Sequence, residues 1–219
     1  MRPAQDAHFR NAMTMSTFTP QPPLVIGLMG GVASGKSTVA AALGRAGLEV
    51  LDADAEARAV VADPVVVDRL KTRFGAALFP GGKLDRSAMA ALVFADPRAR
   101  ADLEAITHPA IRQRLLVRLD AALAAGRSVV LDVPLLLEGG LIERCDVAIF
   151  VDADGAVRRA RARARGWDDA ELARREAAQA DLAVKRQRCS HTISTDGTLE
   201  DVQRQVRDFL ADLLDQRRD

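Results

Sequence analysis

The stretch 24–43, LVIGLMGGVASGKSTVAAAL, constrains the fold of this 219-residue chain more than any other. The apolar run at 24–29 has the character of a buried strand, and an alanine-rich segment typical of a helix begins at Lys36. Across the join lies Gly30-x-x-x-x-Gly35-Lys36-Ser37, the phosphate-binding-loop pattern. Its glycines let successive backbone N–H groups turn toward a polyphosphate, and the N-terminus of the following helix adds partial positive charge.

This loop predicts a nucleotide-phosphate site. The Lys36 ammonium can reach the β- and γ-phosphates of a nucleotide, and the Ser37 hydroxyl can bind Mg²⁺. The alternative is a glycine-rich strand–helix turn with a solvated lysine, which the strand before the pattern and the helix after it disfavour. The residues expected to contact the nucleotide are Gly30, Gly31, Val32, Ala33, Ser34, Gly35, Lys36, Ser37 and Thr38.

The composition is that of an ordinary globular protein. Hydrophobic residues make up 48% of the chain, and 31 Lys and Arg nearly balance 30 Asp and Glu. A net charge near zero argues against a general polyanion binder, so we expect no nucleic-acid partner. The two cysteines, Cys145 and Cys189, match no metal or redox spacing, and reduced thiols are expected.

Residues 1–23 are polar and lack the apolar segment of a secretory signal, and we expect them to form a disordered extension. No apolar stretch approaches the ~20 residues that span a bilayer. We therefore expect a cytoplasmic protein without a membrane partner, acting as a monomer or a weak homo-oligomer.

Strands and helices alternate along the chain, which predicts an α/β fold. The segment 55–127 is almost wholly helical and much longer than a strand–helix–strand crossover needs, so we interpret it as a helical subdomain inserted between two core strands. Its expected breaks fall at 63–64, 79–82, 96–97 and 108–109. Besides 24–29, strands are expected at 48–51, 128–133, 146–151 and 191–194, followed by a closing helix at 199–214.

Three aspartates lie at or near the ends of expected strands. Asp52 and Asp54 follow the strand at 48–51, and Asp132 lies near the end of the strand at 128–133. Carboxylates at the carboxyl ends of parallel strands face the ligand crevice, which places all three near the phosphate loop. One of Asp52 and Asp54 is expected to act in catalysis, and Asp132 to hold Mg²⁺ directly or through water. The alternative is that each caps a helix or stabilises a turn.

The segment 157–188 is rich in arginine, and Arg158, Arg161 and Arg165 share one helical face. We interpret it as a lid whose guanidinium groups neutralise charge on a transferring phosphate. A solvated pair of salt-bridged helices is the alternative, and nucleic-acid binding is disfavoured because interleaved aromatic residues are lacking. The loop at 195–197 lies where it could contact a nucleotide base.

Over about residues 24–214 the sequence closely resembles the dephospho-coenzyme A kinase family. The stretch 26–38 is shared by many phosphate-loop kinases, whereas the combination of the further matching stretches in this order is more specific. Those stretches are Leu51-Asp52-Ala53-Asp54, Phe74-Gly75, His108-Pro109, Val133-Pro134-Leu135-Leu136-Leu137-Glu138 and Arg175-x-x-x-Gln179.

The resemblance implies that ATP, with Mg²⁺, phosphorylates the ribose 3′-hydroxyl of dephospho-coenzyme A. It also implies a three-layer phosphate-loop α/β fold with a five-stranded parallel sheet. The implied parts of the domain 24–216 are a core of 24–54, 128–157 and 189–216, a coenzyme-A-binding helical insert of 55–127 and a lid of 158–188.

By the same resemblance, Asp54 is the base for the attacking hydroxyl, and Lys36 and Arg165 are the other catalytic residues. For His108 a purely structural role is the alternative, with Pro109 starting a helix. The residues implied on the acceptor side are Asp54, Phe74, His108, Arg112 and Leu136, and those implied for Mg²⁺ are Ser37 and Asp132.

Some positions depart from the family pattern. Ala33 stands where the phosphate loop usually has glycine, and we expect the loop backbone to be unchanged. Cys189-Ser190 and Thr195 replace the usual Ala-Asp and Asn, which puts adenine contacts of that loop in doubt. Two other functions stay open at this point: another phosphate-loop nucleoside or nucleotide kinase, and an ATP-binding switch without catalysis.

Overall fold

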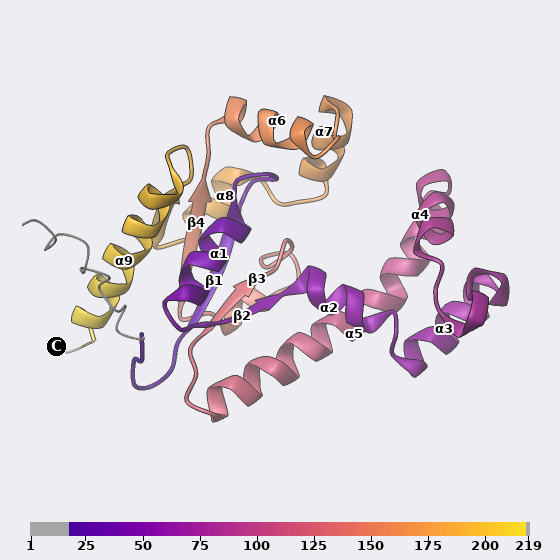
Figure 1. Ribbon diagram of the computed structural model, residues 1–219, viewed down its shortest axis with the longest axis horizontal. Coiled ribbons are helices and arrows are strands. Elements are labelled where there is room, and N and C mark those ends of the chain that lie inside the picture. The colour runs from indigo at the N-terminus through magenta and orange to yellow at the C-terminus, as the bar shows by residue number, and fades with distance from the viewer. Residues whose placement is uncertain (1–17, 218–219) are drawn as a thin grey trace, which may run out of the picture.

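A computed structural model describes residues 18–217 of the chain. Its centre is a five-stranded parallel sheet in the order β2-β3-β1-β4-β5 (Figure 1). The α/β fold with a five-stranded parallel sheet is confirmed. The strands are β1 Val25–Gly30, β2 Glu49–Asp52, β3 Val129–Asp132, β4 Val147–Asp152 and β5 His191–Ser194.

Strand β1 is central and buried along its whole length. Because successive side chains of a strand point to opposite faces, Ile26 and Leu28 belong to one core and Val25 and Met29 to the other. The first core packs β1 against α1 (Lys36–Arg45) and the closing helix α9 (Leu199–Asp215). The second packs the opposite face against the carboxyl half of α5 (Pro97–Ala124) and the segment 133–142.

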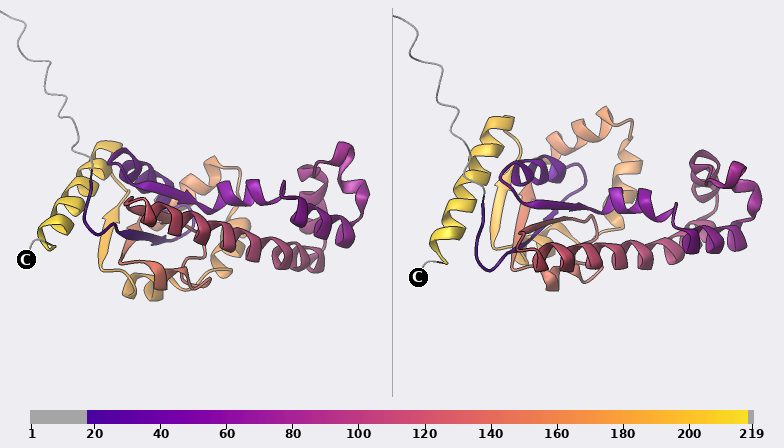
Figure 2. Two further views of the ribbon diagram at one scale, coloured as in Figure 1. Left: turned by 90° about the horizontal axis from the view of Figure 1, so that it is seen from below. Right: turned by 60° about the horizontal axis from the view of Figure 1, so that its bottom comes forward.

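The helical insert extends away from the sheet and has its own small core, built around Val60, Val66, Leu70 and Phe79. In both views of Figure 2 the long helix α5 runs from the insert back to the sheet beside α2. Asp63, Asp85 and Asp96 cap α3, α4 and α5 through their side chains. The insert helices are α2 Ala53–Val60, α3 Pro64–Phe74, α4 Arg86–Ala95 and α5, with short 3₁₀ turns at Ala76–Leu78 and Pro80–Gly82.

The break expected at 108–109 is wrong, because α5 continues through Pro109. Proline removes one backbone donor and usually kinks a helix. Here α5 contacts α2, α3 and α4 as well as β2 and β3. Asp102, on the amino side of Pro109, pairs with Arg73 of α3, and Arg114 and Arg118, on its carboxyl side, pair with Glu56 of α2. This packing on both sides of the proline outweighs the local preference. The first helix of the insert also starts earlier than expected, at Ala53, because Asp52 caps it.

The arginine-rich segment forms α6 (Gly155–Ala164), α7 (Asp169–Ala177) and α8 (Leu182–Gln187). Figure 1 shows α6 and α7 beyond the end of β4, with the insert on the other side of the sheet's carboxyl edge. Helix α8, which we expected to be part of the lid, instead packs beside β1 and buries Lys185. The Lys185 ammonium donates to Gln179 at 2.7 Å and lies 3.6 Å from a Glu138 carboxylate oxygen.

We expected residues 1–23 to be disordered, and the structure contradicts this at the carboxyl end of the segment. Phe18 is buried in the first core, and its N–H donates to the Ala46 carbonyl at 2.9 Å. An aromatic side chain that packs on α1 stabilises this part of the segment. Residues 1–17 lie outside the described part of the chain.

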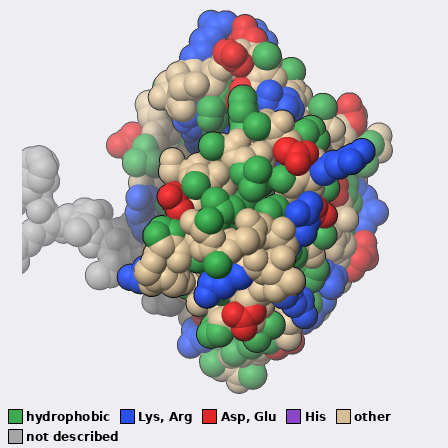
Figure 3. All heavy atoms as spheres, turned by 90° about the vertical axis from the view of Figure 1, so that its right-hand side faces the viewer, with side chains coloured by type: hydrophobic (Ala, Val, Ile, Leu, Met, Phe, Trp, Pro, Cys, Tyr) green, Lys and Arg blue, Asp and Glu red, His purple; other side chains and the backbone are tan. Residues whose placement is uncertain are grey.

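Within residues 18–217, no helix is long and apolar enough to cross a membrane. Figure 3 views the molecule from the insert end, where basic, acidic and hydrophobic side chains alternate over the surface, in keeping with the balanced charge. Cys145 and Cys189 are free thiols, and burial raises the pKa of Cys145 to about 12 and that of Cys189 to about 11. Such thiols are poor nucleophiles at neutral pH.

Candidate active site

The phosphate loop joins β1 to α1 at the carboxyl edge of the sheet. Two of its glycines are required by geometry: a Cβ on Gly30 would lie 2.4 Å from the Val151 carbonyl oxygen, and Gly35 has a φ of 91°. Ala33 adopts a left-handed φ of 60°, so the backbone keeps the conformation that glycine favours at a cost of about 1 kcal/mol. The departure from the family pattern at Ala33 therefore leaves the loop conformation in place.

Lys36, the first residue of α1, turns back toward the loop. Its ammonium donates to the carbonyls of Gly30 at 3.3 Å and Gly31 at 3.1 Å. Burial lowers its pKa to about 8, with the nearby Asp132 carboxylate opposing the shift and the charges of Lys185, Arg165 and Arg158 adding to it. The Lys36 side chain is therefore a partly desolvated cation that points into the concave side of the loop.

A cleft of about 370 Å³ opens in front of the loop. The loop forms one wall, the arginine-rich helical segment that follows β4 forms a second, and the strand ends with the residues after β3 form a third. Its described lining comprises Val32, Ala33, Ser34, Gly35, Lys36, Ser37, Asp54, Arg100, Asp132, Pro134, Leu135, Arg165, Trp167, Arg175, Ala178 and Gln179. The predicted nucleotide residues 32–37, Asp54, Asp132 and Arg165 are thus brought together.

The three aspartates have different environments. Asp52 and Asp132 are paired at the ends of β2 and β3, and the Asp52 carboxylate caps α2 by accepting the Asp54 N–H at 2.8 Å. The capping alternative therefore describes Asp52, whereas Asp54 is exposed and lines the cleft. Burial raises the pKa of Asp132, and the neighbouring charges of Asp52 and Asp54 raise it further against the effect of Lys36.

The side chains that face the cleft fit a hard divalent cation bound together with a polyphosphate. Ser37 and Asp132 could supply the oxygen ligands that Mg²⁺ prefers, and a cation would offset the burial and the repulsion from Asp52 and Asp54 that raise the Asp132 pKa. Among the described residues, no three His, Cys, Asp or Glu side chains are grouped closely enough to hold a metal by themselves.

A second pocket, of about 390 Å³, adjoins the cleft on the insert side. It shares Asp54, Pro134 and Leu135 with the cleft, and α5 contributes His108 and Arg112. The Arg112 guanidinium donates to the Gly139 carbonyl at 3.3 Å, which places the side chain across the pocket wall. Asp54 therefore lies at the junction of two pockets, one on the phosphate-loop side and one on the insert side.

Two residues expected on the acceptor side lie elsewhere. Leu136 is buried in the core beneath β1, where a Cβ on Gly27 would lie 2.7 Å from its side chain. Phe74 ends α3 and packs in the small core of the insert. Both are apolar side chains, which a hydrophobic core readily accommodates. Sequence matching alone cannot distinguish an apolar residue of the core from one that contacts a ligand.

The lid arginines of α6 differ in their partners. Arg158 forms an ion pair with Glu176 of α7, and Arg161 donates to Thr195. Arg165 lines the cleft and has no ion pair to an acidic side chain within the described residues. For several other arginines of the segment, the alternative of salt-bridged helices holds, because each pairs with a carboxylate. These are Arg163, Arg174, Arg175, Arg186 and Arg188.

Sequence reasoning did not predict seven of the residues that line the cleft, and four of these carry polar or aromatic side chains: Arg100, Trp167, Arg175 and Gln179. The Arg175 guanidinium stacks 4.1 Å from the Trp167 ring centroid. Arg175 and Gln179 belong to the stretch Arg175-x-x-x-Gln179, which contributed to the family resemblance but was given no role, so the sequence did point to them. Arg100 comes from α5 and had no local signal.

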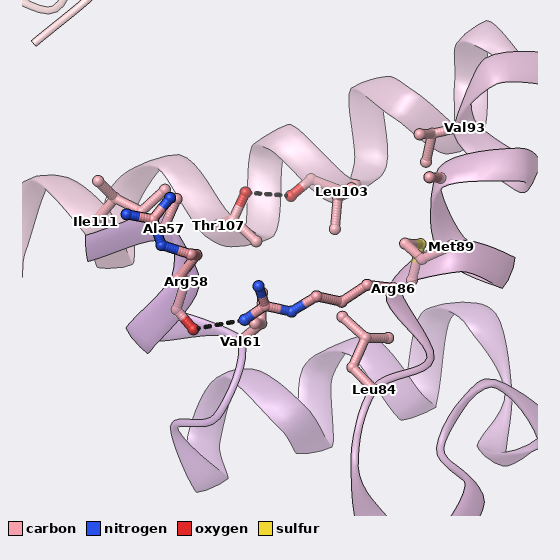
Figure 4. A pocket seen from close by; sticks show the side chains of 11 residues that line it. Ala57, Arg58, Val61, Leu84, Arg86, Met89, Val93, Leu103, Thr107 and Ile111 are labelled. Atoms are coloured by element: carbon pink, nitrogen blue, oxygen red, sulfur yellow. Dashed lines mark hydrogen bonds between the residues drawn. The ribbon is translucent and has the colours of Figure 1, made fainter. Parts of the chain in front are cut away.

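A third pocket, of about 350 Å³, lies inside the insert between α2, α4 and α5 (Figure 4). It shares Ala57 and Ile111 with the second pocket and so continues it away from Asp54. Arg86 reaches across it to the Arg58 carbonyl at 3.0 Å. Its other described lining is mainly apolar: Val61, Leu84, Met89, Ala90, Val93, Leu103 and Thr107.

The fold and the cleft define a class of protein. The fold has a parallel sheet with a phosphate loop at its carboxyl edge, and Lys36 turns back toward this loop. Together with the helical insert and the arginine-rich helices beside the cleft, these features describe a phosphate-loop kinase. The family model described as "Dephospho-CoA kinase" matches residues 24–201. The chain belongs to the dephospho-CoA kinase family.

Named relatives agree with this assignment. The dephospho-CoA kinase of Deinococcus radiodurans is 44% identical over 190 residues, covering 86% of this chain and 91% of that protein. That of Geobacillus kaustophilus is 42% identical over 188 residues, covering 84% and 93%. The solved structure of TT1252 from Thermus thermophilus has a TM-score of 0.66 at 38% identity, covering 87% of this chain and 98% of that chain.

A more distant structure shows the same fold. The dephospho-CoA kinase from Campylobacter jejuni is 18% identical and has a TM-score of 0.65, covering 87% of this chain and 97% of that chain. At this identity the likeness concerns the fold alone.

Proposed function

We propose that this protein transfers the γ-phosphoryl group of ATP to the ribose 3′-hydroxyl of dephospho-coenzyme A, giving coenzyme A and ADP. Membership of the family supports the choice of acceptor. The observation that carries the proposal is the position of Asp54, which lines both the cleft at the phosphate loop and the pocket on the insert side. A base at this junction can contact an acceptor hydroxyl next to the γ-phosphate.

The reaction needs positioning and charge neutralisation more than covalent chemistry by the protein. The acceptor oxygen attacks the γ-phosphorus, the bond to the β–γ bridging oxygen breaks, and ADP leaves with that electron pair. The Asp54 carboxylate orients the hydroxyl and takes its proton. Lys36 and Arg165 face the transferring group from the loop and from the lid. Ser37 and Asp132 would hold Mg²⁺, which would supply positive charge to the phosphates.

The acceptor is long, and the pockets offer it a continuous path. In this arrangement the adenosine lies between Asp54, His108 and Arg112, and the pantetheine arm extends past Ala57 and Ile111 into the apolar pocket of the insert (Figure 4). Arg86 and Arg58 at that pocket offer polar groups to the amides of the arm. An acceptor without this arm leaves the pocket unfilled and is expected to be used poorly.

The direct test measures Mg²⁺-dependent ADP release with dephospho-coenzyme A beside adenosine, AMP, CMP and shikimate. Turnover with dephospho-coenzyme A alone, and a product heavier by one phosphate, supports the proposal. Turnover with a nucleoside or nucleotide instead would assign the chain to another acceptor. ADP release that no acceptor stimulates would favour an ATP-binding switch.

The cytoplasmic location and the monomeric or weakly associated state of the protein are also proposals. Light scattering tests the oligomeric state.

Replacing Asp54 tests the role of the base. Asp54→Asn keeps the size of the side chain but cannot accept the proton, so kcat is expected to fall about 100-fold or more while the Kd for ATP stays within about threefold. The matched control is Asp63→Asn, because Asp63 is the partly exposed cap of α3, away from the cleft, and asparagine caps equally well. Near-normal turnover of Asp54→Asn would remove Asp54 from this role.

A further inference from the structure

Thr195 lies directly after β5 and connects three parts of the active-site region. Its side chain is buried, with a residue exposure of 2%. The Thr195 hydroxyl donates to the Ser34 carbonyl of the phosphate loop at 2.6 Å and also lies 3.3 Å from the Asp152 carbonyl. The Arg161 guanidinium donates to the same hydroxyl at 2.9 Å and to the Thr195 carbonyl at 2.5 Å. Thr195 therefore links the lid helix α6 to the phosphate loop.

The hydrogen bond to Ser34 determines how one loop peptide is oriented. In a planar trans peptide the C=O and the following N–H point in opposite directions. Holding the Ser34 carbonyl toward Thr195 therefore turns the Gly35 N–H the other way, and Gly35 lines the cleft. The Thr195 side chain also packs beneath Gly35, where an added Cβ would meet it at 3.0–3.2 Å. One buried hydroxyl thus fixes a donor that a phosphate needs.

Arg161 has a different role from Arg165. Arg161 lies on α6 and Arg165 directly after it. Both terminal nitrogens of Arg161 donate to Thr195, whereas Arg165 lines the cleft. Arg161 thus holds Thr195 through hydrogen bonds separate from the one to Ser34. This arrangement lets a hydroxyl accept one hydrogen bond and donate another, so the short bond to Ser34 is fixed in direction.

We propose that Thr195 is a positioning residue for nucleotide binding, which holds the Ser34–Gly35 peptide in its phosphate-binding orientation and is itself held by Arg161. The chain departs here from the asparagine usual in the family, and the geometry assigns the threonine to the loop rather than to the base of the nucleotide. The inference rests on the ATP-binding part of the proposed function and is independent of the acceptor.

Two substitutions at Thr195 separate the hydroxyl from the packing. Thr195→Val keeps the shape but leaves the Ser34 carbonyl and one Arg161 donor unpaired, and it is expected to weaken Mg·ATP binding about tenfold. Thr195→Ser keeps the hydroxyl and is expected to stay within about threefold of the wild type. Thr192→Val is the matched control, because Thr192 is an exposed threonine of β5, the strand that ends just before Thr195. Binding is measured by isothermal titration calorimetry with Mg·ATP alone.

Kinetics add a readout that a general loss of stability would not produce. The KM for ATP is expected to rise about tenfold in Thr195→Val, while the KM for dephospho-coenzyme A changes less than twofold. Arg161→Met is expected to weaken ATP binding in the same direction, and the double variant to be no weaker than the weaker single variant, since the residues act as one unit. Arg161→Met also gives a second test if Thr195→Val does not fold.

Wild-type ATP affinity in folded Thr195→Val, an equal loss in Thr195→Ser, or additive losses in the double variant would each overturn the inference. These outcomes are distinct from failure of the proposed function. If the wild-type protein binds Mg·ATP but does not phosphorylate dephospho-coenzyme A, the acceptor assignment fails and the calorimetric comparison still decides the role of Thr195.

Discussion

Lys36 combines two features that oppose each other: it must be charged to attract phosphate, and it is largely desolvated. Burial lowers its pKa to about 8, although Asp132 partly restores it. Near neutral pH the ammonium is therefore mostly protonated, but only about one pH unit separates it from its neutral form. A bound polyphosphate would favour the charged form and raise this pKa.

The activity should consequently fall on the alkaline side. As pH rises through about 8, the free enzyme loses the Lys36 proton and the attraction for ATP, so kcat/KM for ATP is expected to decline above that pH. The alkaline decline of kcat should appear at a higher pH than that of kcat/KM, because bound phosphate keeps Lys36 protonated. Lys36→Arg should remove the alkaline limb whatever its overall rate, since guanidinium stays charged. A wild-type profile that is flat to pH 9.5 would contradict the assigned pKa.

Sequence reasoning at the residue scale succeeded where a motif fixes local geometry. The positions of Lys36, Ser37 and Asp54 followed from the loop pattern and from the rule that ligands bind at the carboxyl ends of parallel strands. It failed where the signal is only tertiary. Nothing near Thr195 in the sequence indicates that its hydroxyl reaches Ser34, and a leucine such as Leu136 has the same appearance in a core as in a pocket.

At the scale of elements, Glu56 joins α2 to α5, and Arg118 extends this link to the sheet. Glu56 lies on α2, is buried, and accepts from Arg114 at 2.9 Å and Arg118 at 2.6 Å, both on α5. Arg118 also donates to Glu49 of β2 at 3.1 Å. Burial by itself raises the pKa of Glu56, but the hydrogen bonds from the two arginines outweigh it and hold the pKa below the usual 4.5.

Glu56→Gln is expected to destabilise the fold by about 1–3 kcal/mol, because it removes the charge from two hydrogen bonds while the arginines stay partly hydrated. A folded-state pKa below the unfolded value gives stability that is full above about pH 4.5 and lost as pH falls through the lowered pKa. The variant should therefore lose less stability between pH 5 and 3 than the wild type. Urea unfolding at both pH values measures this.

The matched control for that experiment is Glu143→Gln. Glu143 pairs with Arg188 on the surface at 2.8 Å, and both side chains are about half exposed or more. Exposed pairs contribute little, so the control should change stability by less than about 1 kcal/mol. Equal losses in the two variants would show that the Glu56 cluster has no special role.

Element boundaries were predictable mainly where capping residues signal them. Asp63-Pro64 and Asp96-Pro97 mark true helix starts, because aspartate caps and proline suits the first turn. His108-Pro109 shows the same kind of signal and lies inside α5. The difference is tertiary: α5 is packed on both sides of Pro109, and packing of this kind is not readable from a dipeptide.

For the whole molecule, the cleft is enclosed by parts that are distant in sequence. The insert contributes Arg100 and the lid Arg165, Trp167 and Arg175. The two parts also approach each other directly, since the Arg174 guanidinium lies 5.9 Å from the Phe94 ring centroid. Periodicity predicted the insert and the lid as helical segments, but not which of their side chains would meet, because that depends on how the long helix α5 is aimed from the sheet.

Trp167, the only tryptophan, reports on this enclosure. It lines the cleft with Arg175 stacked on its ring and Arg165 5.6 Å from the ring centroid. Phosphates that draw these guanidinium groups away change the surroundings of the indole, so fluorescence is expected to shift with Mg·ATP and further when dephospho-coenzyme A is added. Trp167→Phe should abolish the signal, and Lys36→Ala should move the ATP response to higher concentration. An unchanged spectrum at saturating ligands would mean that the lid does not rearrange around Trp167, and the arginines would then have to act from the positions they hold without ligand.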